Sequence, residues 1–360
     1  MMSHENRKSF IMTFSSSVAD LFRALEATVW AGVELELLAD KGLAHTHVRL
    51  TGTGMLARIP KQSQMGLNAL ANLQHQSACF ERAGAGGRTP QLLGLLPPSP
   101  DLPRGALLVQ EILGHPAALP ADLGAMALTL ASLHALPLPP AAGRAPLQDA
   151  ADPLQALYAE IADQASHLPA AGVGSAVAQD INSELVRLHA LFQAADRPER
   201  CLIAFDGHPG NFIVDAAGRA MLVDLEKCRY SYPALDLAHA TLYTSTTWDL
   251  DTRTELSLDE VLQFYAAWAQ AVGAAAGPAR CWHVPLRRAM WLWSVTWCAK
   301  WRAVSGQAAR SGSDGEDWSI ERSDLALVAH VRERVDHYLS PQGVARVLTE
   351  FEALDRALAE

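Results

Sequence analysis

Apolar residues recur at helical spacing near the start of the chain, and this period changes after about forty positions. Apolar positions about four residues apart predict a helix over 16–39, and Ser17 and Asp20 are its candidate caps. Residues 42–61 then alternate around a Thr-Gly-Thr-Gly turn, which predicts a β-hairpin. A second helix is predicted over 66–83, and the apolar run at 105–113 has the length of a strand. The first 115 residues therefore predict a small antiparallel sheet with helices.

Helical patterns dominate the rest of the chain. Short strands are predicted at 201–214 and 219–225. Helices are predicted over 121–135, 153–167 and 173–195, and then from residue 234 to the end except for the polar, Gly/Ser-rich segment 305–317. The fold class expected from these patterns is α+β, with the strands of the sheet gathered near the start of the chain.

Composition narrows the class of protein. The chain has 360 residues, of which 49% are hydrophobic, and a formal net charge of −10. This content supports a sizeable core, and the acidity argues against a nucleic-acid or membrane-surface partner. Five cysteines without CxxC spacing argue against a zinc site or a disulfide framework, and the first ten residues lack a signal-peptide pattern. We expect a cytoplasmic protein.

Two carboxylates and an amide stand around one predicted hairpin within residues 201–240. An apolar strand runs to Asp206, a tight Gly-His-Pro-Gly loop leads to Asn211, and a third strand runs to Asp224. Each residue taken alone is an ordinary turn former. Together they suit phosphoryl transfer, because that reaction needs a carboxylate to orient or deprotonate a hydroxyl and hard oxygen ligands for Mg²⁺.

This stretch resembles the aminoglycoside phosphotransferase and choline kinase-like family. The family signature is His-Gly-Asp-x-His-x-x-Asn, then a strand that ends in Asp, then Asp-x-Ala-x-Asp-Leu-Ala. The corresponding segments here are Asp206-Gly-His-Pro-Gly-Asn211, Val223-Asp224 and Pro233-Ala-Leu-Asp236-Leu-Ala238. The resemblance extends over about residues 35–300 and is strong only at 201–240.

The resemblance implies a bilobal, protein-kinase-like fold with a small antiparallel-sheet N-lobe and a mostly helical C-lobe. It implies an N-terminal tail at 1–15, an N-lobe at 16–112, and a C-lobe at 113–360 whose catalytic loop spans 204–226. Residues 42–47 would be the turn that covers the nucleotide phosphates.

The resemblance also implies the roles of individual residues. Asp206 would be the catalytic base, and Asn211 and Asp224 would be Mg²⁺ ligands. His208 would support the loop, and Asp236 would brace it from below. The co-substrate would be ATP or GTP, with its adenine contacted by backbone groups at Gln110, Glu111 and Leu113.

The chain departs from the family pattern at two places that concern the site. Ala204 replaces the first histidine of the signature, and Arg58 replaces the strand lysine that grips the phosphates. Arg contacts phosphates with a different geometry from Lys. The helix residue that would pair with Arg58 is either Gln76, which is neutral, or Glu81.

Three further residues are candidates for the acceptor side. Glu226 is either a second metal ligand or substrate contact, or a surface carboxylate paired with Lys227 or Arg229. Trp301 belongs to a helical stripe of tryptophans that lines either an acceptor pocket or the core. Trp248 is either a cleft residue or part of a cap network.

The sequence therefore predicts a kinase that phosphorylates a hydroxyl of a small acceptor, and it leaves the acceptor open. The alternative is a catalytically weak or inactive kinase-like module that binds a nucleotide or another ligand.

Overall fold

The computed structural model describes residues 18–39, 42–194, 196–309, 312 and 314–359. These residues form two compact units. The first unit holds the described part of 1–81 together with 90–111 and 308–328, and the second holds 82–89, 112–307 and 329–360. The predicted tail and the predicted cap at Ser17 lie outside the described residues.

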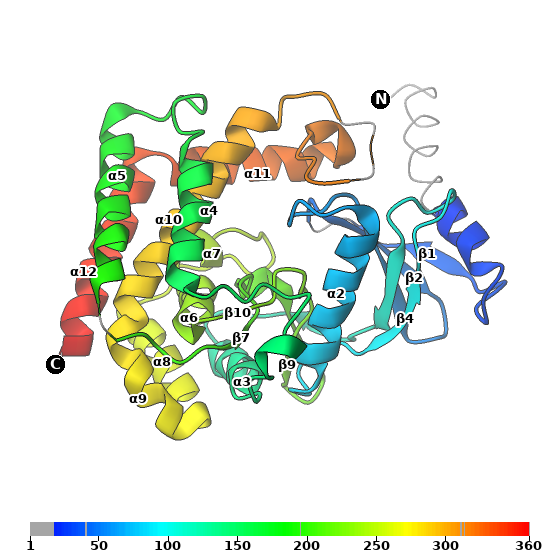
Figure 1. The fold of residues 1–360 in the computed structure, drawn as a ribbon, viewed down its shortest axis with the longest axis horizontal. Coiled ribbons are helices and arrows are strands. Elements are labelled where there is room, and N and C mark those ends of the chain that lie inside the picture. Colours follow the sequence, from blue (N-terminus) through cyan, green and yellow to red (C-terminus); the bar gives the residue numbers. More distant parts are fainter. Residues whose placement is uncertain (1–17, 40–41, 195, 310–311, 313, 360) are drawn as a thin grey trace. The chain divides into compact units, whose positions relative to one another are not determined.

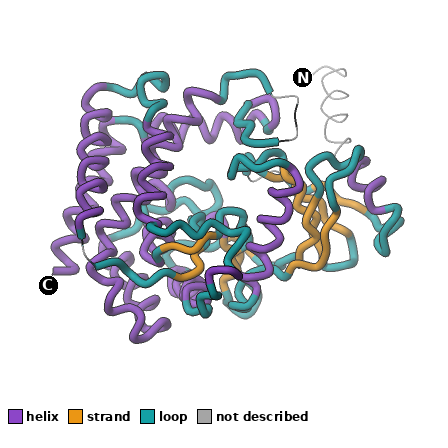
Figure 2. Tube along the Cα trace, in the orientation of Figure 1, coloured by secondary structure: helices purple, strands orange, loops and turns teal. Residues whose placement is uncertain are grey.

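A five-stranded antiparallel sheet is the main feature of the first unit, and α2 lies alongside it (Figures 1 and 2). The strand order is β1-β2-β3-β5-β4. The elements are β1 (Leu35–Leu37), β2 (His45–Leu50), β3 (Met55–Pro60), α2 (Ala69–Gly84), β4 (Leu92–Leu96) and β5 (Ala106–Gln110). The β2–β3 turn is the predicted Thr-Gly-Thr-Gly segment, in which Gly52 and Gly54 take positive φ angles of 77° and 70°.

Three local expectations for this unit are wrong. The first helix ends at residue 25, and β1 lies within the range predicted to be helical because its residues pair with β2. β4 was not expected at all. His45 and His47 lie within β2, so they are not part of a hairpin turn, and only 42–44 of the proposed phosphate-covering segment precede the strand.

The core of the first unit lies on one face of the sheet. Leu21 and Leu25 of the helical residues 18–25 pack against apolar side chains of β2, β3 and β5. Because side chains alternate along a strand, Ala57 faces this core and Arg58 faces the other way. The Arg58 guanidinium lies over the ring of Phe80 from α2, 5.3 Å from its centroid.

A segment late in the chain also belongs to the first unit. The Ser63 and Ala69 N–H groups donate to the Gly315 carbonyl at 2.9 Å and to Asp314 Oδ1 at 3.0 Å. The Asp317 N–H donates to Gln62 Oε1 at 2.9 Å. The expected C-lobe at 113–360 includes this polar segment, because long-range hydrogen bonds of this kind leave no local pattern in the sequence.

Helices make up most of the second unit. α10 packs against α4, α5 and α12, and these helices lie side by side in Figure 1. The helices are α3 (Leu123–His134), α4 (Pro153–Ala165), α5 (Ser175–Ala190), α6 (Pro233–Thr241), α7 (Tyr243–Thr246), α8 (Leu258–Val272), α9 (Ala276–Ala279), α10 (His283–Val304), α11 (Leu325–Tyr338, which begins in the first unit) and α12 (Pro341–Ala359). Among the described residues, no helix combines the length and the apolar character needed to cross a bilayer.

Two small antiparallel sheets position the loop that carries the signature residues. β7 (Cys201–Ile203) pairs with β10 (Arg229–Ser231). β8 (Phe212–Val214) pairs with β6 (His115–Pro116) and with β9 (Ala220–Leu222). The loop after β7 leads into β8, and the segment after β9 leads into β10, which pairs with β7.

Candidate active site

The loop after β7 is held by one buried carboxylate. Asp236, on α6, accepts hydrogen bonds from the backbone N–H groups of Ala204 and Phe205, both at 2.7 Å. Phe205 has a φ of 61°, which is rare for a residue other than glycine and costs free energy unless the surroundings hold it. The two bonds to Asp236 therefore fix the backbone that leads into Asp206.

A second layer of hydrogen bonds orients Asp236. His134 Nε2 lies 3.0 Å from Asp236 Oδ2, and Trp268 Nε1 donates to His134 Nδ1 at 3.0 Å. Because an indole N–H only donates, His134 accepts at Nδ1 and donates from Nε2. His134 and Trp268 leave no signal in the sequence that links them to the loop, since they come from α3 and α8 and share no local pattern with it.

Asp206 is paired with a lysine. Lys227 Nζ donates to Asp206 Oδ2 at 2.8 Å, and both side chains are nearly buried. Burial alone raises the pKa of Asp206. Lys227, together with His208 and His239, more than offsets this effect, so the pKa lies below its ordinary value. Asp206 is thus a carboxylate at neutral pH.

Asn211 ties the loop together. Its Nδ2 donates to the Asp206 carbonyl at 2.8 Å, and its backbone N–H donates to the His208 carbonyl at 3.0 Å. The Val223 N–H donates to the Asn211 carbonyl at 2.9 Å, which links the loop to the segment that carries Asp224. Since the amide nitrogen faces Asp206, the amide oxygen of Asn211 points away from it.

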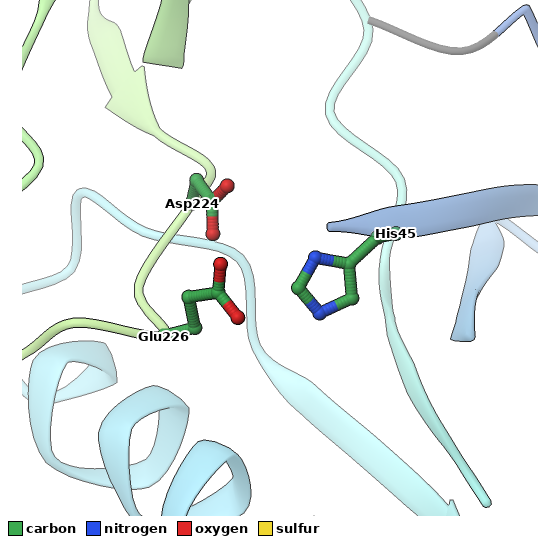
Figure 3. Close-up of side chains that lie close together, drawn as sticks. All are labelled: His45, Asp224 and Glu226. Carbon is green, nitrogen blue, oxygen red and sulfur yellow. The ribbon is translucent and has the colours of Figure 1, made fainter. Parts of the chain in front are cut away.

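Asp224 and Glu226 form a pair of carboxylates after β9. Their oxygens lie within 4.8 Å of each other, and Figure 3 shows the two side chains turned toward a common point. Glu226 is only 3% exposed, so it is not the surface carboxylate of the alternative interpretation. The basic side chains named in that interpretation have other carboxylate partners, since Lys227 pairs with Asp206 and Arg229 pairs with Glu160.

A chain of charged and aromatic groups continues from Lys227. Its ammonium lies over the ring of Trp293 on α10, 5.0 Å from the centroid. Trp293 Nε1 donates to Glu160 Oε1 at 2.7 Å, and Arg229 Nη1 donates to Glu160 Oε2 at 2.9 Å. Burial raises the pKa of Glu160, but Arg229, Trp293 and Lys227 together hold it below its ordinary value.

The two tryptophans singled out from the sequence lie elsewhere in this unit. Trp301 is 3% exposed and belongs to the buried residues of α10, as the core interpretation has it. Trp248 is partly buried and stacks on Tyr338, with ring centroids 6.2 Å apart. The tryptophan of the stripe that reaches the Asp206 cluster is Trp293.

In the first unit, Arg58 and Gln76 share a histidine. Arg58 Nη2 lies 3.4 Å from His45 Nδ1, and His45 Nε2 lies 3.2 Å from Gln76 Oε1. All three side chains are buried, whereas Glu81 is exposed on α2. Of the two helix residues considered, Gln76 is the one in the Arg58 network.

The residues expected to contact adenine lie at the end of β5 and directly after it. The N–H groups of Gln110 and Glu111 already donate to the carbonyls of Gln91 and Gly54, at 2.9 and 2.8 Å. These two N–H groups are therefore committed within the sheet. Leu113, which follows in the second unit, has a side chain that is 74% exposed.

Comparison with known proteins decides the family. The profile of the phosphotransferase enzyme family matches residues 41–291, which is most of the chain. The chain belongs to this family. The expectation of a phosphotransferase is confirmed at this level, whereas no curated protein sequence matches the chain significantly.

Solved structures of phosphotransferases share the fold. A choline/ethanolamine kinase family protein from Mesorhizobium loti has a TM-score of 0.60 at 17% identity, over 93% of this chain and 98% of that one. A choline kinase from Streptococcus pneumoniae has a TM-score of 0.54 at 15% identity, over 88% and 99%. A gentamicin complex of an aminoglycoside phosphotransferase has a TM-score of 0.54 at 13% identity, over 91% and 97%. The predicted α+β, protein-kinase-like fold is confirmed.

Proposed function

We propose that this phosphotransferase transfers the γ-phosphate of a nucleoside triphosphate to a hydroxyl of a small acceptor, with Asp206 as the catalytic base. The observation that carries the proposal is the rigid setting of Asp206. Asp236 holds the backbone before it, and Asn211 holds its carbonyl. A carboxylate fixed in this way orients an acceptor hydroxyl for in-line attack.

A lowered pKa at Asp206 is compatible with this role. The transition state of phosphoryl transfer is loose, so the acceptor proton leaves late and a strong base is not required. What the reaction requires is a carboxylate that is ionised and correctly placed. Lys227 keeps Asp206 ionised, and the loop contacts place it.

The residues after β9 suit Mg²⁺. In the second unit the candidate donors are oxygens, from the carboxylates of Asp224 and Glu226 and the amide of Asn211, and Mg²⁺ prefers such ligands. When bound, Mg²⁺ would neutralise charge on the nucleotide phosphates. We assign Asp224 and Asn211 as its ligands and Glu226 as a further candidate.

The nucleotide contacts are also part of the proposal. Arg58 would bind the phosphates that are not transferred, and its guanidinium can do so through two N–H groups. With the N–H groups of Gln110 and Glu111 used by the sheet, we expect adenine or guanine recognition to depend more on Leu113. Structures of related fold hold ATP or GDP, so either base is a candidate.

The test separates turnover from binding. A panel of hydroxyl acceptors is screened with Mg-ATP and Mg-GTP by release of the nucleoside diphosphate. With the best acceptor, Asp206→Ala should lower kcat by about 10²-fold or more and change the Kd of the Mg-nucleotide less than about threefold. Asp215→Ala removes a carboxylate from the β8–β9 turn and is the matched control. Turnover of Asp206→Ala near that of the wild type would contradict the base assignment.

Two observations favour the alternative of a weak or inactive binding module. Lys227 occupies an oxygen of Asp206, and Ala204 stands where the family signature has histidine. If the protein is such a module, Mg-nucleotide binds normally, and no acceptor in the panel raises diphosphate release above that of Asp206→Ala. The same experiment therefore decides between the two functions.

A further inference from the structure

The base of this phosphotransferase has a cation of the chain beside it. The Lys227 ammonium donates to Asp206 Oδ2 at 2.8 Å and lies 5.0 Å from the centroid of the Trp293 ring. Lys227 is 9% exposed and Trp293 is 6% exposed. A carboxylate on one side and an indole face on the other form the setting in which proteins bind an ammonium group.

The position of this ammonium is fixed from several directions. The Trp293 ring is held by its hydrogen bond to Glu160 and by edge contact with Phe205, with ring centroids 5.2 Å apart. The Lys227 carbonyl accepts from Arg229 Nε at 3.3 Å. The Arg229 guanidinium in turn lies 3.6 Å from the centroid of Phe205 and pairs with Glu160.

One oxygen of Asp206 already has a cation of the chain beside it. Two basic side chains, Lys227 and Arg229, pair with Asp206 and Glu160 respectively. An ammonium of an acceptor placed beside Asp206 would meet the Lys227 charge at short range in a nearly dry environment, where repulsion between like charges is strong. An alcohol without such a group meets no repulsion, and its oxygens can accept hydrogen bonds from the lysine ammonium.

We propose that Lys227 determines acceptor specificity: it fills the ammonium subsite beside Asp206, so the acceptor is an alcohol with no ammonium group near the reacting hydroxyl, such as a polyol or sugar. This inference rests on the proposed function of Asp206. It also separates this chain from proteins of similar fold that are named as choline/ethanolamine kinase family members, or as an aminoglycoside phosphotransferase in complex with gentamicin.

The experiment measures acceptor binding directly, by calorimetry with choline and with the matched neutral alcohol 3,3-dimethyl-1-butanol, in which carbon replaces the nitrogen. Wild type should bind choline no more tightly than the neutral alcohol. Lys227→Met removes the cation while keeping the length and most of the apolar volume, and should bind choline at least about tenfold more tightly than wild type. Lys227→Arg keeps a cation and should not gain choline binding.

Two outcomes would overturn the proposal. One is preferential binding of choline by the wild type. The other is a Lys227→Met protein that keeps the circular dichroism spectrum and melting temperature of Lys227→Arg and gains no choline affinity. Release of nucleoside diphosphate with the acceptor panel, measured on the same samples, reports on the proposed function separately, because failure of that function abolishes turnover and leaves the comparison of choline binding valid.

Discussion

Replacing Asp236 by asparagine tests how the loop before the proposed base is held. Asp236 is fully buried and accepts three hydrogen bonds, from the N–H groups of Ala204 and Phe205 and from His134 Nε2. An amide offers one oxygen, and its NH₂ group faces at least one of these donors. Leaving a buried donor unsatisfied costs about 1–3 kcal/mol, and losing the charge weakens the other bonds by about 1 kcal/mol. We expect Asp236→Asn to lower the free energy of unfolding of the second unit by about 2–4 kcal/mol.

The assay is urea unfolding followed by circular dichroism, with amide hydrogen exchange of the peptide that contains Ala204 and Phe205. Exchange should accelerate in Asp236→Asn. Asp152→Asn is the matched control, because Asp152 also accepts two backbone N–H bonds, at the start of α4, but asparagine caps helices equally well. Asp152→Asn should change stability by less than about 0.5 kcal/mol. Equal stability and unchanged exchange in Asp236→Asn would refute the reasoning.

Three further predictions concern stability. Burial, assisted by Arg280, lowers the pKa of His283 from 6.5 to about 4, so the unfolded chain takes up a proton first as pH falls. Stability should therefore fall between pH 6.5 and 4 by up to about 1.4 kcal/mol per pH unit. The urea midpoint of His283→Gln should depend less steeply on pH than that of the wild type. Equal pH dependence of the two midpoints would contradict this assignment. Gly114→Ala should destabilise by about 1–3 kcal/mol in urea unfolding, because the added Cβ meets the Val214 carbonyl; wild-type stability would show that the backbone yields. Gly124→Ala, in open space on α3, should be neutral or stabilising by up to about 1 kcal/mol. A lower stability of this variant would show a contact that the structure does not account for.

The fold and the signature residues were predictable because their signals are local. The alternation on both sides of the Thr-Gly-Thr-Gly turn fixed β2 and β3, and the helical periods gave α2 to α5 to within a few residues. Asp206, Asn211 and Asp224 lie within nineteen positions of one another in the sequence, so a short hairpin suffices to bring them near each other. β1 escaped prediction because its pairing with β2 outweighs a helical period in its own residues.

The surroundings of Asp206 were not predictable in the same way. Glu160, Trp293 and His134 come from α4, α10 and α3, and only packing of these helices brings them to the loop. Lys227 was visible in the sequence but was matched with Glu226, its neighbour along the chain. Its true partner, Asp206, is set by the pairing of β7 with β10, which a single sequence does not reveal.

The most direct test of the account is the response of thermal stability to Mg-nucleotide. A ligand that binds only the folded state at a hundred times its Kd stabilises by about 2.7 kcal/mol. The account predicts that Mg-ATP or Mg-GTP raises the Tm of the wild type and of Asp215→Ala, that omitting the metal reduces this shift, and that Asp224→Ala abolishes it. Wild-type protein that shows no shift with either nucleotide, or an Asp224→Ala protein that responds like the wild type, would contradict it.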